Sequence, residues 1–148
     1  LLYSMAISYR FTNQHSRAIK TLAMFFSKSL LAERERLFMD ASWLFIILHY
    51  EKGNMETVET YLESMKRKLR KTSEAEAMDR YLLKLITHLI NSSSATELTD
   101  GFRQFQREIL KNEKLPRKGT FNYENWCGEF LASHTPDNEW IAKSEIVL

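Results

Sequence analysis

Apolar residues recur every three or four positions along most of this chain, and this spacing constrains the fold more than any other feature. It appears in two clear sets, Ile19, Leu22 and Phe26, and then Leu98, Phe102, Phe105 and Ile109. Such a period is typical of one face of an α-helix, and the alternation expected of a strand is absent. Only four Gly and two Pro occur in 148 residues, so little interrupts long helices. The sequence therefore predicts an all-α fold.

Capping and turn residues place the ends of the predicted helices. Ser73 and Ser94 each precede a Glu by three positions, which is the spacing of a capping box and predicts two helix starts. Gly53 followed by Asn54 predicts a left-handed helix stop and then an N-cap. We expect helices at 2–12, 14–31, 33–52, 55–71, 74–91 and 95–112, then a linker at 113–121 and a shorter helix near 122–133.

The pattern also repeats, because a shift of 40 residues superposes three pairs of predicted helices without a gap. The turns align as Asn13, Gly53 and Ser93. Apolar positions align on the first helices (Met5, Phe45, Leu85; Ala6, Ile46, Ile86) and on the second helices (Ala18, Val58, Leu98; Leu22, Leu62, Phe102; Phe25, Met65, Phe105). We therefore expect residues 1–112 to form three antiparallel helix hairpins of about 40 residues each.

These positions resemble those of the tetratricopeptide (TPR) family in a degenerate form. The first pair carries the resemblance, at Ala6, Tyr9, Asn13, Ala18, Leu22 and Phe25. The longer period, the bulky Ile46, Val58 and Met65, and the missing closing proline depart from the family pattern. The resemblance implies a short right-handed TPR-like solenoid of stacked hairpins. Residues 122–148 are expected to pack on the repeats as a C-terminal cap, or else to occupy the solenoid's groove; an irregular helical bundle is the alternative architecture.

The resemblance also implies a function, because TPR proteins bind peptides or partner proteins in a groove lined by the first helices. Carried onto this chain, the partner-binding positions are Tyr3, Arg10, Asp40, Trp43, Ile47, Tyr50 and Arg80. Aromatic rings beside Arg and Asp are the usual composition of an interaction hot spot. The opposite interpretation is that Trp43 and Ile47 belong to the core, since helix 33–52 is apolar around most of its circumference. Exposure of Trp43 distinguishes the two interpretations.

The chain begins at Leu1, directly within an apolar periodic segment. This start leads to a second hypothesis, in which the chain is a structural helical segment of a longer protein whose function lies elsewhere. An interaction or scaffold module is the hypothesis we favour.

A run of positive charge near residue 70 raises a third hypothesis. Its members are Lys66, Arg67, Lys68, Arg70 and Lys71, which lie on one broad arc opposite an apolar stripe. Such a run is typical of a solvated face, and it also complements the dipole of a helix end. Binding of nucleic acid or an acidic partner by this basic face is the alternative. The net charge of only +2 and the absence of a nucleic-acid-binding motif favour a protein or peptide partner instead.

Catalytic and metal-binding motifs are not recognisable in the sequence. The four His are scattered, the single Cys127 has no partner thiol, and four Gly do not form a phosphate-binding loop. We therefore expect a non-enzymatic protein without metal or cofactor, with Cys127 as a buried structural thiol. The longest apolar run, residues 43–48, is far shorter than the roughly 20 residues of a membrane span. A cytoplasmic protein is the expectation.

Overall fold

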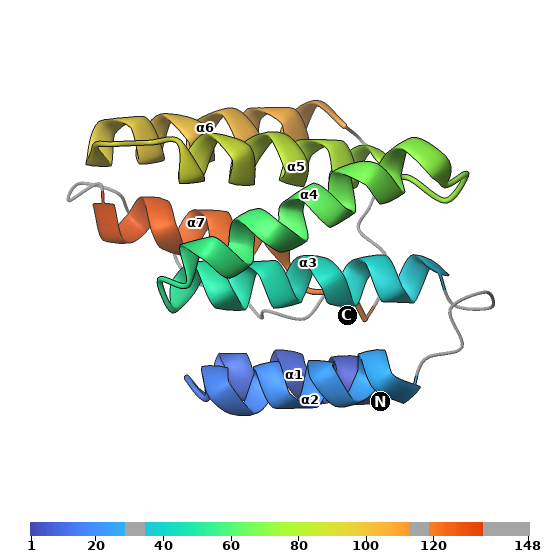
Figure 1. The fold of residues 1–148 in the computed structure, drawn as a ribbon. Helices are drawn as coiled ribbons and strands as arrows, with labels where there is room; N and C mark the ends of the chain where they lie inside the picture. The colour runs from blue at the N-terminus through green and yellow to red at the C-terminus, as the bar shows by residue number, and fades with distance from the viewer. Residues whose placement is uncertain (29–34, 113–118, 135–148) are drawn as a thin grey trace. The chain divides into compact units, whose positions relative to one another are not determined.

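The computed structural model describes residues 1–28, 35–112 and 119–134, and these residues form seven α-helices and no sheet (Figure 1). The all-α prediction is confirmed. The helices are α1 (Leu2–Phe11), α2 (His15–Lys28), α3 (Glu35–Glu51), α4 (Met55–Lys71), α5 (Ala77–Ile90), α6 (Ala95–Lys111) and α7 (Tyr123–His134). All seven were predicted, and most of their ends lie within two residues of the expected positions.

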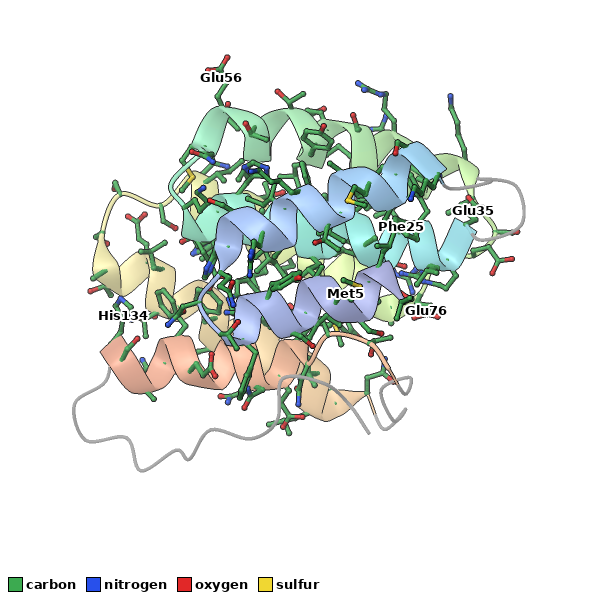
Figure 2. The ribbon with its side chains drawn as sticks, turned by 90° about the horizontal axis from the view of Figure 1, so that it is seen from below. Met5, Phe25, Glu35, Glu56, Glu76 and His134 are labelled. Atoms are coloured by element: carbon green, nitrogen blue, oxygen red, sulfur yellow. The ribbon has the colours of Figure 1, made fainter. Side chains whose placement is uncertain are left out.

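The chain divides into two compact units, Leu1–Ala75 with α1 to α4 and Glu76–Leu148 with α5 to α7. The boundary falls between the second and third of the predicted hairpins. In the first unit α1 packs on α2 and α3 packs on α4, while α3 also contacts α2 and, to a smaller extent, α1. Figure 2 shows α1 and α2 side by side in this unit.

Helix α3 is the centre of the first unit. Nine of its 17 residues are buried, and at about 100° per residue they cover most of its circumference. Burial of apolar surface on this scale is the main source of stability for a small helical unit. Around it lie the fully buried Ala6, Ala18, Leu22 and Val58 from the other three helices. The apolar positions that a 40-residue shift aligns therefore form much of this core.

The second unit is built on α6, which contacts both α5 and α7. Phe102 of α6 stacks on Phe130 at 4.0 Å between ring centroids and meets Trp126 edge-on at 5.2 Å. The predicted C-terminal helix thus packs on the last hairpin. Residues 135–148 of the expected C-terminal cap, and residues 113–118 of the predicted linker, lie outside the described residues.

The first two hairpins close with the same turn, 40 residues apart. Asn13 and Gly53 both have left-handed backbone, with φ of 59° and 80°. In the first turn the amide of residue 13 donates to the carbonyl of residue 10 at 2.9 Å, and the amide of residue 14 donates to that of residue 9 at 2.7 Å. In the second turn the amide of residue 53 donates to the carbonyl of residue 50 at 3.0 Å, and the amide of residue 54 donates to that of residue 49 at 2.9 Å. This is the bonding pattern of a Schellman helix end. The predicted left-handed stop at Gly53 is confirmed.

The third hairpin closes differently: the predicted capping box forms only in part, because the Glu97 carboxylate binds the amide of Ser93 rather than that of the N-cap, Ser94. Its hydroxyl accepts the Glu97 amide at 3.2 Å, and the Glu97 carboxylate accepts the Ser93 amide at 2.9 Å. Side chains thus satisfy amides that have no partner within the helix. The three turns are equivalent in position, but only the first two are equivalent in chemistry.

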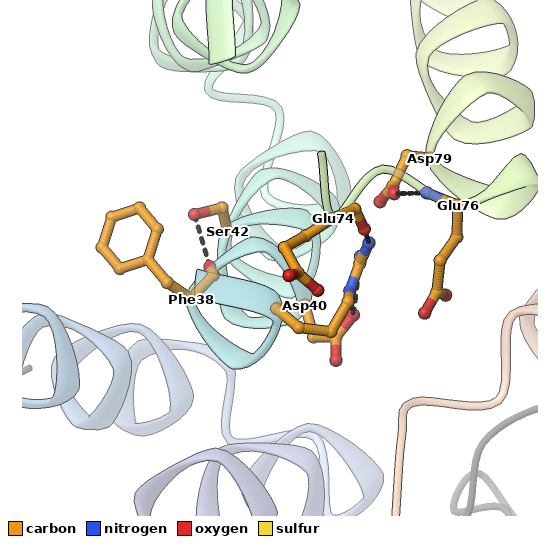
Figure 3. A network of polar contacts seen from close by, with 7 residues as sticks. Phe38, Asp40, Ser42, Glu74, Glu76 and Asp79 are labelled. Carbon is orange, nitrogen blue, oxygen red and sulfur yellow. Dashed lines mark hydrogen bonds and ion pairs between the residues drawn. The ribbon is translucent and has the colours of Figure 1, made fainter. Parts of the chain in front are cut away.

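The helix start predicted at Ser73 is wrong, because α5 begins only at Ala77 with Glu76 as its N-cap. The Asp79 carboxylate accepts the Glu76 amide at 2.7 Å, so a different acidic pair forms the cap. Upstream, the Glu74 amide donates to the Thr72 hydroxyl at 3.0 Å, and the Glu74 carbonyl accepts a bond from Arg36 at 3.0 Å (Figure 3). These bonds keep the Glu74 backbone outside the helix.

Candidate interaction surface

The apolar members of the predicted partner-binding set are inside the protein. Trp43 and Ile47 are 0% exposed and Tyr3 is 4% exposed. The interpretation of Trp43 and Ile47 as core residues is therefore confirmed, because α3 is covered on nearly every side. The exposure that the groove hypothesis requires of Trp43 is absent.

Arg10, predicted to meet a partner, instead joins α1 to α3. Its Nε and Nη2 donate to the two carboxylate oxygens of Glu51 at 2.8 and 2.7 Å, with the Arg10 side chain only 6% exposed. His15 Nε2 lies 3.4 Å from the same carboxylate. This two-point geometry is the strongest form of an Arg–carboxylate pair. Arg10 is thus a structural contact between the first helices of two hairpins.

Asp40 is likewise used internally. Its Oδ1 accepts bonds from Arg36 Nη2 at 3.0 Å and Nε at 3.3 Å within α3, and its side chain is 4% exposed. Arg36 also donates to the Glu74 carbonyl, so one guanidinium joins the start of α3 to the segment after α4 (Figure 3). A buried carboxylate requires such a partner, because an unpaired buried charge is strongly destabilising.

Only two members of the set reach the surface. Tyr50 is half-buried, and burial, followed by the nearby Glu51 charge, raises the pKa of its hydroxyl. Arg80 is exposed on α5, in the second unit. The aromatic hot spot predicted on the first helices is therefore not a feature of the exposed surface.

The basic run occupies the last third of α4, and its members differ in their surroundings. Arg67, Arg70 and Lys71 are exposed. Lys66 lies 3.5 Å from a Glu63 oxygen, whereas Lys68 Nζ stands 4.7 Å from the centre of the Phe38 ring. The cation of Lys68 is thereby attracted to an aromatic face on the neighbouring helix.

Phe38 is one end of an aromatic strip, by which we mean Phe26, Phe38, Phe45, His49 and Tyr61. Phe26 of α2 lies 5.2 Å from Phe38 and 5.6 Å from Phe45, both on α3. Phe45 lies 4.5 Å from His49 and 4.8 Å from Tyr61 of α4. The strip thus crosses three helices of the first unit. Phe45 is buried, Phe26, Phe38 and His49 are half-buried, and Tyr61 is 42% exposed.

The strip is the feature that sequence reasoning missed. Phe38, Ser42, Phe45 and His49 follow one another at intervals of four, three and four residues, so the α3 part of the strip was visible as one helix face. The contributions of Phe26 and Tyr61 depend on how α2 and α4 pack against α3. That packing was not visible in the spacing.

Cys127 has the surroundings of a structural thiol, as predicted. It is fully buried, and its Sγ donates to the Phe102 carbonyl at 3.2 Å. Burial, followed by the Glu124 charge, raises its pKa to about 12. In the described ranges no three His, Cys, Asp or Glu side chains are placed to share a metal ion. None of the described helices has the length and apolar character to cross a bilayer.

Comparison with known proteins finds no matching family model, no matching curated protein and no matching solved structure.

Proposed function

We propose that this chain is a protein–protein interaction module built from degenerate TPR-like helix hairpins. The observation that carries the proposal is the repeated Schellman turn, in which the same two backbone bonds recur after 40 residues at Asn13 and Gly53. The packing order agrees with it, because α3 contacts both helices of the preceding hairpin. Stacking of each hairpin on its neighbour is the defining arrangement of a helical solenoid.

Burial at equivalent positions supports extending the proposal to the third hairpin. Ala6, Ile46 and Ile86, which a 40-residue shift aligns on the first helices, are all at most 1% exposed. The same holds on the second helices, where Leu22, Leu62 and Phe102 are all at most 4% exposed. A right-handed stack of three hairpins ending in α7 is the architecture that we propose for the whole chain.

The partner surface must use exposed helix faces rather than the first-helix residues selected by resemblance. Solenoids bind partners through extended surfaces formed by repeated helices. Two observations bear on the competing structural-segment hypothesis. The burial of Tyr3 and Trp43 agrees with the structural-segment hypothesis. That hypothesis also expects an exposed surface of charged residues only, whereas Tyr61 and Phe11 are 42% and 64% exposed. We therefore favour a binding function.

Selection of peptide ligands from a displayed library of random 16-residue sequences tests the proposal. The bait is the full chain, and a heat-denatured sample removes peptides that bind unfolded protein. An interaction module should yield related sequences that bind saturably at one site, as measured by calorimetry. Failure to enrich any sequence family above the denatured bait would contradict the binding function and favour a structural role.

A further inference from the structure

Lys68 of α4 brings positive charge to the aromatic strip. Helix α2, which supplies Phe26, contains Arg17, Lys20 and Lys28 but no Asp or Glu. Across residues 1–75 there are twelve Lys and Arg against eight Asp and Glu. The strip therefore lies in the more basic part of the chain.

Helix α4 separates its charges between two sides. Tyr61, a member of the strip, and Lys68, which lies over Phe38, share a side of α4 with Thr57, Ser64 and Lys71 at helical spacing, and that side carries no carboxylate. The other exposed side carries all three Glu of the helix together with Lys66 and Arg70. Glu56, at the start of that side, projects away from the neighbouring helices (Figure 2).

The separation places Lys68 and Lys71 on the side of α4 where that helix carries no carboxylate. Lys66 has Glu63 within ion-pair distance. Within the described part of the chain, by contrast, no carboxylate is within 4.0 Å of Lys68 or Lys71. Solvation and the helix dipole explain positive charge at a helix end in general. They do not explain why the three Glu of α4 all lie on the side of that helix away from the rings.

We propose that the aromatic strip, with Lys68 and Lys71, is a docking surface for an acidic segment of a partner protein. This inference rests on the proposed binding function and names the surface and the partner's chemistry. Partly exposed rings supply contact area, and fixed charges at the border give orientation and speed of association. The partner segment places apolar or aromatic side chains on the rings and carboxylates on the lysines.

The size of the strip sets the size of the segment. From Phe38 to His49 the strip follows eleven residue steps of α3, about 16 Å at 1.5 Å per residue. A helix of three turns, or an extended segment of about five residues, covers that length. Peptides of 16 residues are therefore long enough to reach the strip and the lysines together.

Paired charge reversals on α4 provide the test. Lys68→Glu/Lys71→Glu reverses the charge beside the strip, and Lys66→Glu/Arg70→Glu makes the same change in net charge on the other side of the same helix. Both variants are checked by circular dichroism and thermal melting. Lys68→Gln/Lys71→Gln is a milder variant in case the reversal unfolds the helix end, and Tyr61→Ala tests the rings.

The probes are the peptides selected on the native chain, measured by fluorescence anisotropy. We expect the selected sequences to be rich in Asp, Glu and aromatic residues. Their affinity should fall about tenfold with Lys68→Glu/Lys71→Glu and with Tyr61→Ala, and should change little with the control Lys66→Glu/Arg70→Glu. Affinity should also fall as salt rises from 50 to 500 mM, because exposed charges are screened.

The outcomes separate this inference from the proposed function. If the selected peptides bind the native chain but both charge reversals change their affinity equally, or neither changes it, the docking surface is refuted. The proposed binding function then still stands. Failure to select any peptide refutes both. A fluorescent single-stranded oligonucleotide is measured in parallel. If it alone binds, and binding requires Lys68 and Lys71, the surface belongs to nucleic acid and the inference is overturned.

Discussion

Replacing Arg10 with Met removes the guanidinium that joins α1 to α3 while keeping a side chain of similar length. Hydrogen bonds to charged groups contribute about 1.5–3 kcal/mol each, and breaking a fully buried pair costs about 3–5 kcal/mol. Glu51 is 23% exposed and keeps His15 at 3.4 Å, so its charge is not left wholly unsolvated. We therefore expect Arg10→Met to lower the free energy of unfolding by about 2–3 kcal/mol.

Urea unfolding followed by circular dichroism measures this loss, and a double-mutant cycle assigns it to the pair. Glu51→Met and the double variant complete the cycle. Since the double variant leaves no unpaired charge, it should lose less than the sum of the single variants, with a coupling energy of about 1.5–2 kcal/mol. Arg67→Met is the matched control, because Arg67 is exposed and makes only a 3.3 Å bond to Ser64. It should change stability by less than about 0.5 kcal/mol.

Additive effects in the cycle, or an Arg10→Met variant as stable as the native chain, would refute this reasoning. Arg10 would then be available at the surface, as the TPR resemblance implied.

Four other predictions concern the surroundings of single residues elsewhere in the chain. Trp43→Ala should cost about 3–5 kcal/mol in urea unfolding because the ring is fully buried, and a loss below about 1 kcal/mol would place it outside the core. A Cβ on Gly101 would clash with the His88 ring, 2.4 Å from its Cδ2. Gly101→Ala should therefore stabilise a His88→Ala variant, which lacks the ring, by about 1 kcal/mol but should not stabilise the native chain. Equal gains in stability in both backgrounds would disprove the clash. Burial, then the Lys52 charge, lowers the pKa of His49 below its ordinary 6.5. The contribution of His49 to the free energy of unfolding should therefore be complete above pH 6.5 and fall as pH drops below that value. An NMR titration midpoint for His49 at or above 6.5 would contradict the lowered pKa. Because its pKa is raised to about 12, Cys127 should react with a thiol reagent at pH 8 only after unfolding, and rapid reaction of the native chain would count against burial.

The helices were predictable because amphipathic spacing and turn residues are local properties of the sequence. The left-handed stop at Gly53 and the N-cap bond of Ser94 were found where expected. The Ser73 start failed because a competing Glu76–Asp79 cap and a bond from Arg36, 38 residues before Glu74, hold that segment outside the helix. A distant contact of this kind leaves no trace in local spacing.

The surface was less predictable, for two physical reasons. A helix that is apolar on all sides does not reveal which face is exposed, so Trp43 fitted both a hot spot and the core. Charged residues are equally ambiguous, because the partner of Arg10 lies 41 residues away. The aromatic strip appears only when Phe26 and Tyr61 are brought to α3 by packing.

The central claim is that a partner docks on the aromatic strip rather than on the first-helix positions selected by resemblance. Amide NMR of the labelled full chain, titrated with the tightest peptide from the selection, tests it directly. We predict the largest shift changes at Phe38, Phe45, Tyr61 and Lys68, and along the Phe26 side of α2. Changes confined to α1, or to α5, α6 and α7, would contradict the claim.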